Sequence, residues 1–147
     1  MDILGRWVVE GVLSFDEDFN RSYVSIEEYL NSPYDDDDPD TIRHEQTERR
    51  RMCSTVIDIL ADGTIKNMMV IPEDITQEEL DESGMEVIEG KYIVLESGLW
   101  KEEDGKYFVK AGHETDENGV TSDHYEPMEV DADGYLYYLL MLKMKRA

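Results

Sequence analysis

The residues best suited to chemistry in this sequence are its histidines. They are His44, His113 and His124. Two of them stand beside a carboxylate, in His113-Glu114 and in Asp123-His124. If residues 113–124 connect two neighbouring strands, these side chains converge, and imidazole together with carboxylate is a ligand set that suits zinc. The spacing matches no established zinc motif, so we expect an ordinary acidic loop and predict no metal site.

Other reactive groups are few. Residues 35–40 offer carboxylates for calcium, but Pro39 interrupts them and no glycine stands at the sixth position, as an EF-hand loop requires. Residues 131–134, Asp-Ala-Asp-Gly, are typical of a hairpin turn. Cys53 falls in an expected strand, where a thiol is usually buried and inert. No nucleophile elbow, Walker loop or dinucleotide-binding glycine motif is present. We therefore predict no cofactor and no catalytic residue, and an enzyme is only the third hypothesis.

A set of aromatic, thioether and leucine side chains is the best indication of function. They stand in strand-like stretches from which they are expected to point inward, and such mixtures line many small-molecule cavities. The set is Trp7, Met69, Trp100, Phe108, Tyr125, Met128, Tyr137, Leu139 and Met141. The same side chains would also suit a solid core, because a barrel of about eight strands is either filled or has room for one ligand. The sequence leaves both alternatives open.

Length and charge limit the partners. The 147 residues suffice for one domain with a real core but not for two, so we expect a single domain over residues 1–147. The formal net charge is −22, from 36 acidic and 14 basic side chains. Such a surface repels phosphate backbones and anionic lipid headgroups. Only residues 49–51 and the last few residues are basic clusters, so we expect neither nucleic acid nor a membrane as a partner.

The compartment follows from cysteine usage and the first residues. Cys53 is the only cysteine, so no intrachain disulfide can form. Asp2 and Arg6 interrupt the first apolar stretch, which argues against a signal peptide or a transmembrane segment. We expect a cytoplasmic protein, or a secreted one if a signal peptide has been removed.

Strands joined by short turns dominate the pattern. Asp-Gly stands between apolar runs three times, at residues 62–63, 104–105 and 133–134, and this is the strongest short-range signal of a β-hairpin. The predicted strand pairs are residues 51–60 with 64–71, 98–103 with 106–112, and 124–130 with 135–144. A first strand near residues 3–13 and weaker strands near 86–96 bring the total to eight or nine. The sequence therefore predicts an all-β protein with antiparallel strands.

Two short helices are expected beside these strands. Residues 25–28, Ser-Ile-Glu-Glu, match a capping box and open a helix through Leu30. Residues 76–79, Thr-Gln-Glu-Glu, match a second one, whose helix ends before Gly84. Residues 35–40 are expected to form a solvated loop.

The two ends of the chain carry a resemblance to a known group of folds. The first strand contains Gly5-Arg6-Trp7, and the chain ends with a basic segment that includes Arg146. A Gly-x-Trp paired with a late Arg resembles the signature of the lipocalins and the wider calycin barrels, although the Thr-Asp-Tyr loop of lipocalins is not found. The resemblance is closest to a bacterial lipocalin-like domain.

That resemblance implies both a fold and a function. Trp7 would close one end of an up-and-down barrel behind Gly5, and Arg146 would lie across its indole, a packing that cation–π attraction favours. Such calycin-like barrels often hold a small apolar molecule. We therefore expect a binding protein for a small apolar ligand. The alternative is a protein-interaction module with a filled barrel and an acidic surface.

The last predicted strand bears on oligomeric state. Residues 135–142, Tyr-Leu-Tyr-Tyr-Leu-Leu-Met-Leu, are apolar on both faces, where the wall of a barrel should alternate. Either the two helices cover the outer face and the protein is a monomer, or a second copy covers it in a homodimer.

Overall fold

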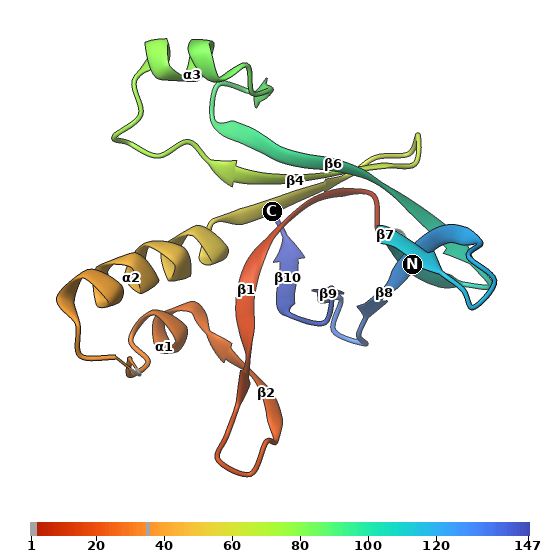
Figure 1. Cartoon of the computed structure of the whole chain (residues 1–147), viewed down its shortest axis with the longest axis horizontal. Coiled ribbons are helices and arrows are strands. Elements are labelled where there is room, and N and C mark those ends of the chain that lie inside the picture. The colour runs from red at the N-terminus through yellow and green to blue at the C-terminus, as the bar shows by residue number, and fades with distance from the viewer. Residues whose placement is uncertain (1–2, 35) are drawn as a thin grey trace.

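A computed structural model of the chain describes residues 3–34 and 36–147, and its centre is a closed antiparallel barrel of eight strands (Figure 1). The strands of the barrel are β1 (Gly5–Phe15), β3 (Thr55–Ile59), β4 (Thr64–Val70), β6 (Tyr92–Glu103), β7 (Lys106–Thr115), β8 (Thr121–Val130), β9 (Leu136–Tyr138) and β10 (Leu142–Arg146). They pair in the order β1-β3-β4-β6-β7-β8-β9-β10, and β10 returns to β1. The prediction of an all-β antiparallel barrel is confirmed.

Two more strands and three helices lie outside the barrel. The strand β2 (Arg21–Ser25) pairs with the outer half of β1, and β5 (Val87–Ile88) pairs with β6. The helices are α1 (Ile26–Leu30), α2 (Pro39–Cys53) and α3 (Gln77–Ser83). None of these helices, in the part of the chain that the structure describes, is long and apolar enough to cross a membrane.

The local turn and cap signals produce the expected elements. Each of the three Asp-Gly pairs joins two antiparallel strands, and its glycine has positive φ. The predicted capping boxes open α1 and α3, where the hydroxyl groups of Ser25 and Thr76 accept hydrogen bonds from backbone N–H groups of the first turn. The αL conformation of Gly84 ends α3.

The helix α2 corrects two predictions. The acidic segment predicted as a loop leads into a 15-residue helix, and the first residues of the predicted strand 51–60 belong to the end of this helix. Asp38 caps it, accepting a hydrogen bond from the backbone N–H of Thr41, and Pro39 stands in its first turn. Asp35, in the same predicted loop, lies outside the described residues, as does Asp2. The all-β core thus carries one helix that is not short.

The last predicted strand, residues 135–144, is in fact a hairpin. The chain turns at Leu139 and Leu140, which have φ angles of 52° and 59°, and β9 and β10 pair with one another on either side. The apolar residues 135–142 are therefore divided between two strands and the turn that joins them. Its outer side is partly covered by β2, because the rings of Tyr23 and Tyr137 lie 4.9 Å apart and the Tyr23 hydroxyl donates to the Leu140 carbonyl oxygen.

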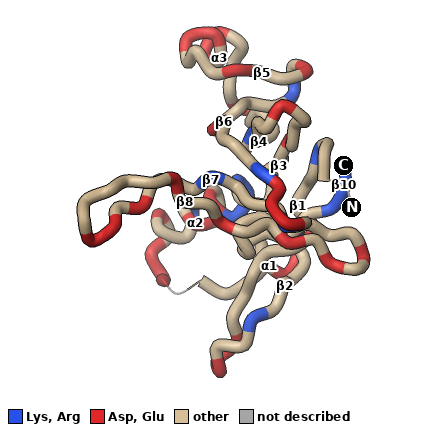
Figure 2. Tube along the Cα trace, turned by 90° about the vertical axis from the view of Figure 1, so that its right-hand side faces the viewer, with Lys and Arg blue, Asp and Glu red and all other residues tan. Residues whose placement is uncertain are grey.

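Acidic side chains occupy the outlying parts of the molecule (Figure 2). They cluster on α3 and at the tips of the β1–β2 and β7–β8 hairpins, in residues 16–18 and 114–117. Here they face solvent, where like charges are best screened. The barrel interior holds the apolar core instead.

Candidate functional site: the open end of the barrel

Trp7 is buried inside the barrel, near the N-terminal end of β1. Its side chain is 1% exposed, and its Nε1 donates to the Ile3 carbonyl oxygen at 2.9 Å. The guanidinium carbon of Arg146 lies 4.3 Å from the centroid of the indole ring, and its Nη1 donates to the Leu4 carbonyl oxygen. Gly5 has a φ of 121°, and a Cβ there would lie 3.0 Å from Arg146 Nη1. A side chain at this position would therefore strain the backbone and crowd the arginine that covers Trp7.

Side chains also fill the interior next to this end. Met128 is buried, and Trp100 packs against the same core while its Nε1 donates to the Leu60 carbonyl oxygen at 2.8 Å. The ring of Tyr107 lies 6.4 Å from that of Trp100. These side chains belong to the buried core or pack against it, and Tyr107 and Met128 also line a third pocket, of about 790 Å³.

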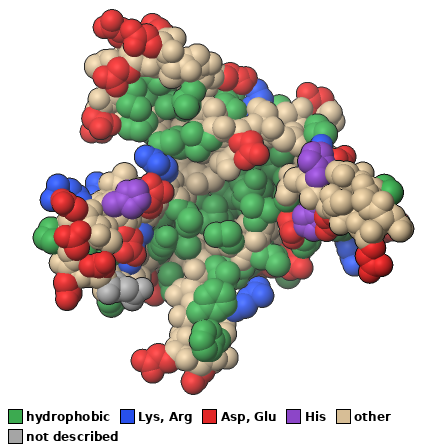
Figure 3. Space-filling view, viewed as in Figure 1, with side chains coloured by type: hydrophobic (Ala, Val, Ile, Leu, Met, Phe, Trp, Pro, Cys, Tyr) green, Lys and Arg blue, Asp and Glu red, His purple; other side chains and the backbone are tan. Residues whose placement is uncertain are grey.

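The other end is open and contains two adjoining pockets. One has a volume of about 280 Å³ and the other about 260 Å³, and both are lined by Asn67, Tyr138 and Leu139. The first is also lined by Glu48, Arg51, Met52, Thr55, Leu95, Met141 and Leu142. The second is also lined by Ile65, Glu96, Gly98, Val109, Lys110 and Ala111. Figure 3 shows apolar side chains gathered in the hollow between α2, α3 and the β7–β8 hairpin.

Asn67 is the polar group at the centre of this site. It lies in β4 opposite Ile57 of β3 and Glu96 of β6, beside a bulge between Asn67 and Met68. Its Oδ1 atom is buried and accepts no hydrogen bond from any residue that the structure describes. Buried amide oxygens are normally paired, since an unpaired one loses its hydrogen bonds to water without replacement.

Tyr138 forms the wall that the two pockets share. Burial raises the pKa of its hydroxyl, and the nearby carboxylate of Glu96 raises it further. Both effects disfavour the phenolate, so the ring presents a neutral hydroxyl near neutral pH.

The lip of the site is a turn made of two leucines. A hydrogen bond from the Met141 N–H to the Tyr138 carbonyl oxygen, at 3.1 Å, closes it around Leu139 and Leu140. Positive φ at two consecutive residues is the geometry for which asparagine and glycine are preferred, because a Cβ is strained there. Backbone strain of this kind gathers at functional sites.

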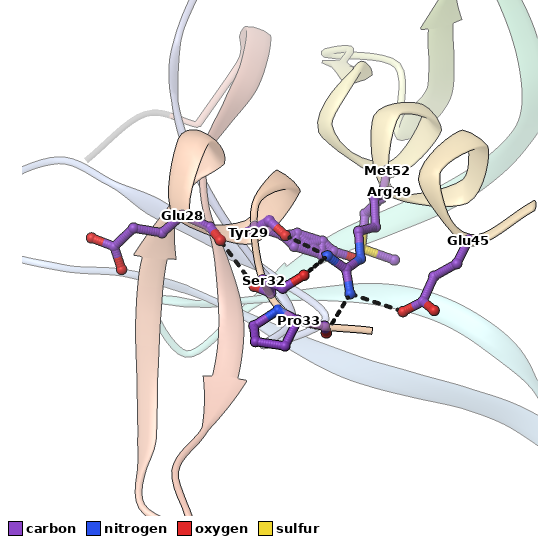
Figure 4. A network of polar contacts seen from close by, with 7 residues as sticks. All are labelled: Glu28, Tyr29, Ser32, Pro33, Glu45, Arg49 and Met52. Atoms are coloured by element: carbon purple, nitrogen blue, oxygen red, sulfur yellow. Dashed lines mark hydrogen bonds and ion pairs between the residues drawn. The ribbon is translucent and has the colours of Figure 1, made fainter. Parts of the chain in front are cut away.

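The wall contributed by α2 is held by Arg49 (Figure 4). This arginine is 7% exposed, and its guanidinium donates to the backbone carbonyl oxygens of Tyr29, Ser32 and Pro33 and to Glu45 Oε1. The Tyr29 hydroxyl lies 3.6 Å from the sulfur of Met52, which lines the first pocket. Arg49 thus ties α1 and the segment after it to the helix that borders the site.

The predicted lining residues fall into three groups. Trp7, Trp100 and Met128 belong to the buried core or pack against it. Leu139 and Met141 line the open pockets. The remaining four, Met69, Phe108, Tyr125 and Tyr137, do not line these two pockets, but Phe108 lines the third pocket together with Met128.

Strand alternation explains why Phe108, Tyr125 and Tyr137 do not line these two pockets. Phe108 and Tyr125 lie on the face of the β6–β7–β8 sheet opposite to the buried Val109, and Lys101 Nζ stands 5.9 Å and 4.1 Å from their ring centroids. Tyr137 follows the fully buried Leu136 and donates its hydroxyl to Asp131 Oδ2 at 2.7 Å.

Met69 instead lies in an outer groove beside α2. That groove, of about 660 Å³, runs between the C-terminal half of α2 and the segment before α3.

Two of the three histidines pair with carboxylates on the β7–β8 hairpin. His124 lies between Glu126 and Glu114 on the β7–β8 hairpin, and the hydrogen bond to Glu126 is the largest cause of its raised pKa. His113 Nδ1 stands 3.2 Å from Asp123 Oδ1. Within residues 3–34 and 36–147, no three acidic, histidine or cysteine side chains are grouped so as to hold a metal ion.

Sequence reasoning missed Asn67 and Tyr138, the residues that join the two pockets. The signal for Asn67 was present, because it stands two residues after the core residue Ile65 in one strand and therefore shares its inward face. Tyr138 was hidden in an apolar run whose turn was not recognised.

Comparisons of the chain with protein-family models, with curated proteins and with solved structures found no match. The fold is compatible with a calycin-like barrel, and that likeness rests on the closed antiparallel strands and on the Gly5–Trp7–Arg146 arrangement.

Proposed function

We propose that this protein binds one small, mainly apolar molecule at the open end of the barrel. The observation that carries the proposal is the pair of adjoining pockets, which share Asn67, Tyr138 and Leu139. Small-molecule sites typically have volumes of about 300–1,000 Å³ and are lined mainly by apolar side chains with a few polar ones. Taken together, the two pockets fall in this range.

The exposure of the lining supports the same function. Leu95, Leu139 and Met141 are 48%, 37% and 48% exposed around the first pocket. Apolar side chains that converge on a hollow gain free energy when a ligand covers them, whereas scattered ones on a convex surface do not. The strained leucine turn at the lip adds a second reason, because its geometry is costly and places Leu139 against both pockets.

The experiment is a binding measurement with prodan, a neutral naphthalene dye that has no hydrogen-bond donor. We expect a blue-shifted, saturable fluorescence signal and a rise in the unfolding midpoint, with about 2.7 kcal/mol of added stability at a hundred times the Kd. Met141→Trp should abolish binding by filling the first pocket. Met69→Trp is the matched control, because Met69 lies in the outer groove. Absence of any signal, or equal loss in both variants, would refute the proposal.

The alternative of a protein-interaction module is favoured by one observation, the tip of the β1–β2 hairpin. Phe15 and Phe19 are 57% and 83% exposed there, beside the acidic residues Glu17 and Asp18. An aromatic pair with an acidic rim suits an apolar pocket of a cationic partner. The test is photo-crosslinking in cells with p-benzoylphenylalanine in place of Phe19, and in place of Val120 at the other hairpin tip as the control. A discrete adduct specific to Phe19 supports this alternative, and identical patterns contradict it.

A further inference from the structure

We propose that the ligand is a neutral molecule with a hydroxyl or primary amide group, and that Asn67 binds this group. The inference rests on the proposed function and names the chemical class that the site accepts. It starts from the unpaired Oδ1 of Asn67, because a buried polar atom without a partner in an otherwise paired structure points to a partner that is missing.

The surroundings of Asn67 explain why the protein itself supplies no partner. Its neighbour across β3 is Ile57, which is fully buried and apolar, and the inward residue before it on β4 is Ile65. The carboxylate of Glu96, opposite it on β6, has no proton to donate when ionised. The hydroxyl of Tyr138, which lines the same pockets, makes no hydrogen bond to Oδ1 either, so we assign the donor to the contents of these pockets.

The chemistry of an amide selects the complementary group. The oxygen accepts hydrogen bonds and the NH₂ group donates them, and rotation about the Cβ–Cγ bond presents either end to the pockets. A hydroxyl or a primary amide both donates and accepts, so it matches the side chain in both orientations. An ether or a hydrocarbon leaves Oδ1 unpaired.

The charges around the pockets favour a neutral ligand. Glu48 and Glu96 line the first and the second pocket. The two cations in the lining are already paired, because Arg51 lies 3.1 Å from Glu48 Oε1 and Lys110 lies 3.3 Å from Asp123 Oδ1. A carboxylate ligand would face these acidic side chains in a protein of net charge −22. An ammonium group would lose its hydration against the apolar walls.

The experiment compares ligands of equal length by calorimetry near neutral pH. The probes are 1-nonanol, nonanamide, nonanoate and 1-methoxynonane, which differ only at the polar end. We expect 1-nonanol and nonanamide to bind about tenfold more tightly than 1-methoxynonane or nonanoate, the effect of one hydrogen bond made in an apolar site. Because this comparison uses the unaltered protein, it does not depend on any variant folding.

The variant Asn67→Leu then assigns the effect to one side chain. It should remove the preference for 1-nonanol over 1-methoxynonane, so that these two probes bind the variant with equal affinity. If prodan binds but the protein has the same affinity for all four chain probes, this inference is wrong and the proposed function still stands. Failure of every probe, prodan included, would refute the proposed function itself.

Discussion

Arg146 covers the indole of Trp7 from the last strand of the barrel, with its guanidinium carbon 4.3 Å from the ring centroid. The two residues are direct neighbours in the pairing of β1 with β10, so the contact forms only when the barrel closes. The pairing of β1 with β10 thus brings together two residues that are far apart in the sequence.

Trp7→Ala should therefore destabilise the whole domain. Removing a large buried side chain leaves a cavity, and such a change typically costs about 3–5 kcal/mol. Phe15→Ala, at an exposed position on the same strand, should change stability by less than about 0.5 kcal/mol. Urea unfolding followed by circular dichroism measures both, and equal stabilities of the two variants would contradict the role of Trp7.

Arg49→Ala should loosen the wall that α2 contributes to the open end. The substitution leaves three backbone carbonyl oxygens without their donor, and we expect a loss of about 2–4 kcal/mol together with weaker prodan binding. Arg43→Ala on the same helix is the control, because the Arg43–Asp40 ion pair is exposed and should contribute about 0–0.5 kcal/mol. If the two variants unfold at the same urea concentration, the Arg49 contacts do not stabilise the wall.

Replacing the leucine turn by the residues that its geometry favours should separate stability from binding. Leu139→Asn combined with Leu140→Gly removes the strain of two positive φ angles. We expect the free energy of unfolding to rise by about 1 kcal/mol. The same change deletes an apolar side chain that lines both pockets, so the affinity for prodan should fall. Thermal unfolding with and without the dye tests both statements, and unchanged affinity would place the ligand elsewhere.

Phe19→Gly should also stabilise the protein. Three hairpin loops share one hydrogen-bonding pattern, in which Asp16, Asp116 or Asp131 accepts from the backbone of the residues that follow. At the positive-φ position two of these loops have a glycine, Gly119 and Gly134, whereas the first has Phe19 with a φ of 60°.

Glycine relieves that strain, although its greater freedom in the unfolded chain offsets part of the effect. We therefore expect the free energy of unfolding to rise by about 0.5–1 kcal/mol. Gly119→Ala should lower the free energy of unfolding by about the same amount. Chemical unfolding of both variants is the measurement, and destabilisation by Phe19→Gly would show that the phenylalanine contributes packing of its own.

His124 should titrate above the usual histidine value of about 6.5. The hydrogen bond to Glu126, with Glu114 beside the other ring nitrogen, favours the imidazolium and raises its pKa. Because the folded pKa is the higher one, this contribution to stability is complete below the unfolded pKa and disappears as the pH rises through the folded value. An NMR titration of the His124 ring protons gives the midpoint. Glu126→Gln should lower it, and an unchanged midpoint would contradict the assignment.

Much of the framework could be predicted because its signals are local. The three Asp-Gly turns and the caps at Ser25 and Thr76 act over two to four residues, so neighbouring residues alone specify them. Hydrophobic periodicity does not predict the helix α2, because the one buried side chain of this helix is that of Arg49. Its start, with Asp38 as the cap and Pro39 in the first turn, was readable but lay inside an acidic run.

The sequence by itself determined the antiparallel strands, most turns, and the contact between Trp7 and Arg146. Only the tertiary structure decided where the cavity lies. The turn at Leu139 and Leu140 opposes local preference and is held by distant strands, through the bonds from the Leu13 N–H to the Met141 carbonyl oxygen and from the Tyr23 hydroxyl to the Leu140 carbonyl oxygen. The Oδ1 atom of Asn67 has no hydrogen-bond donor among its neighbours Ile57 on β3 and Glu96 on β6. This property depends on strand register, which no single segment contains.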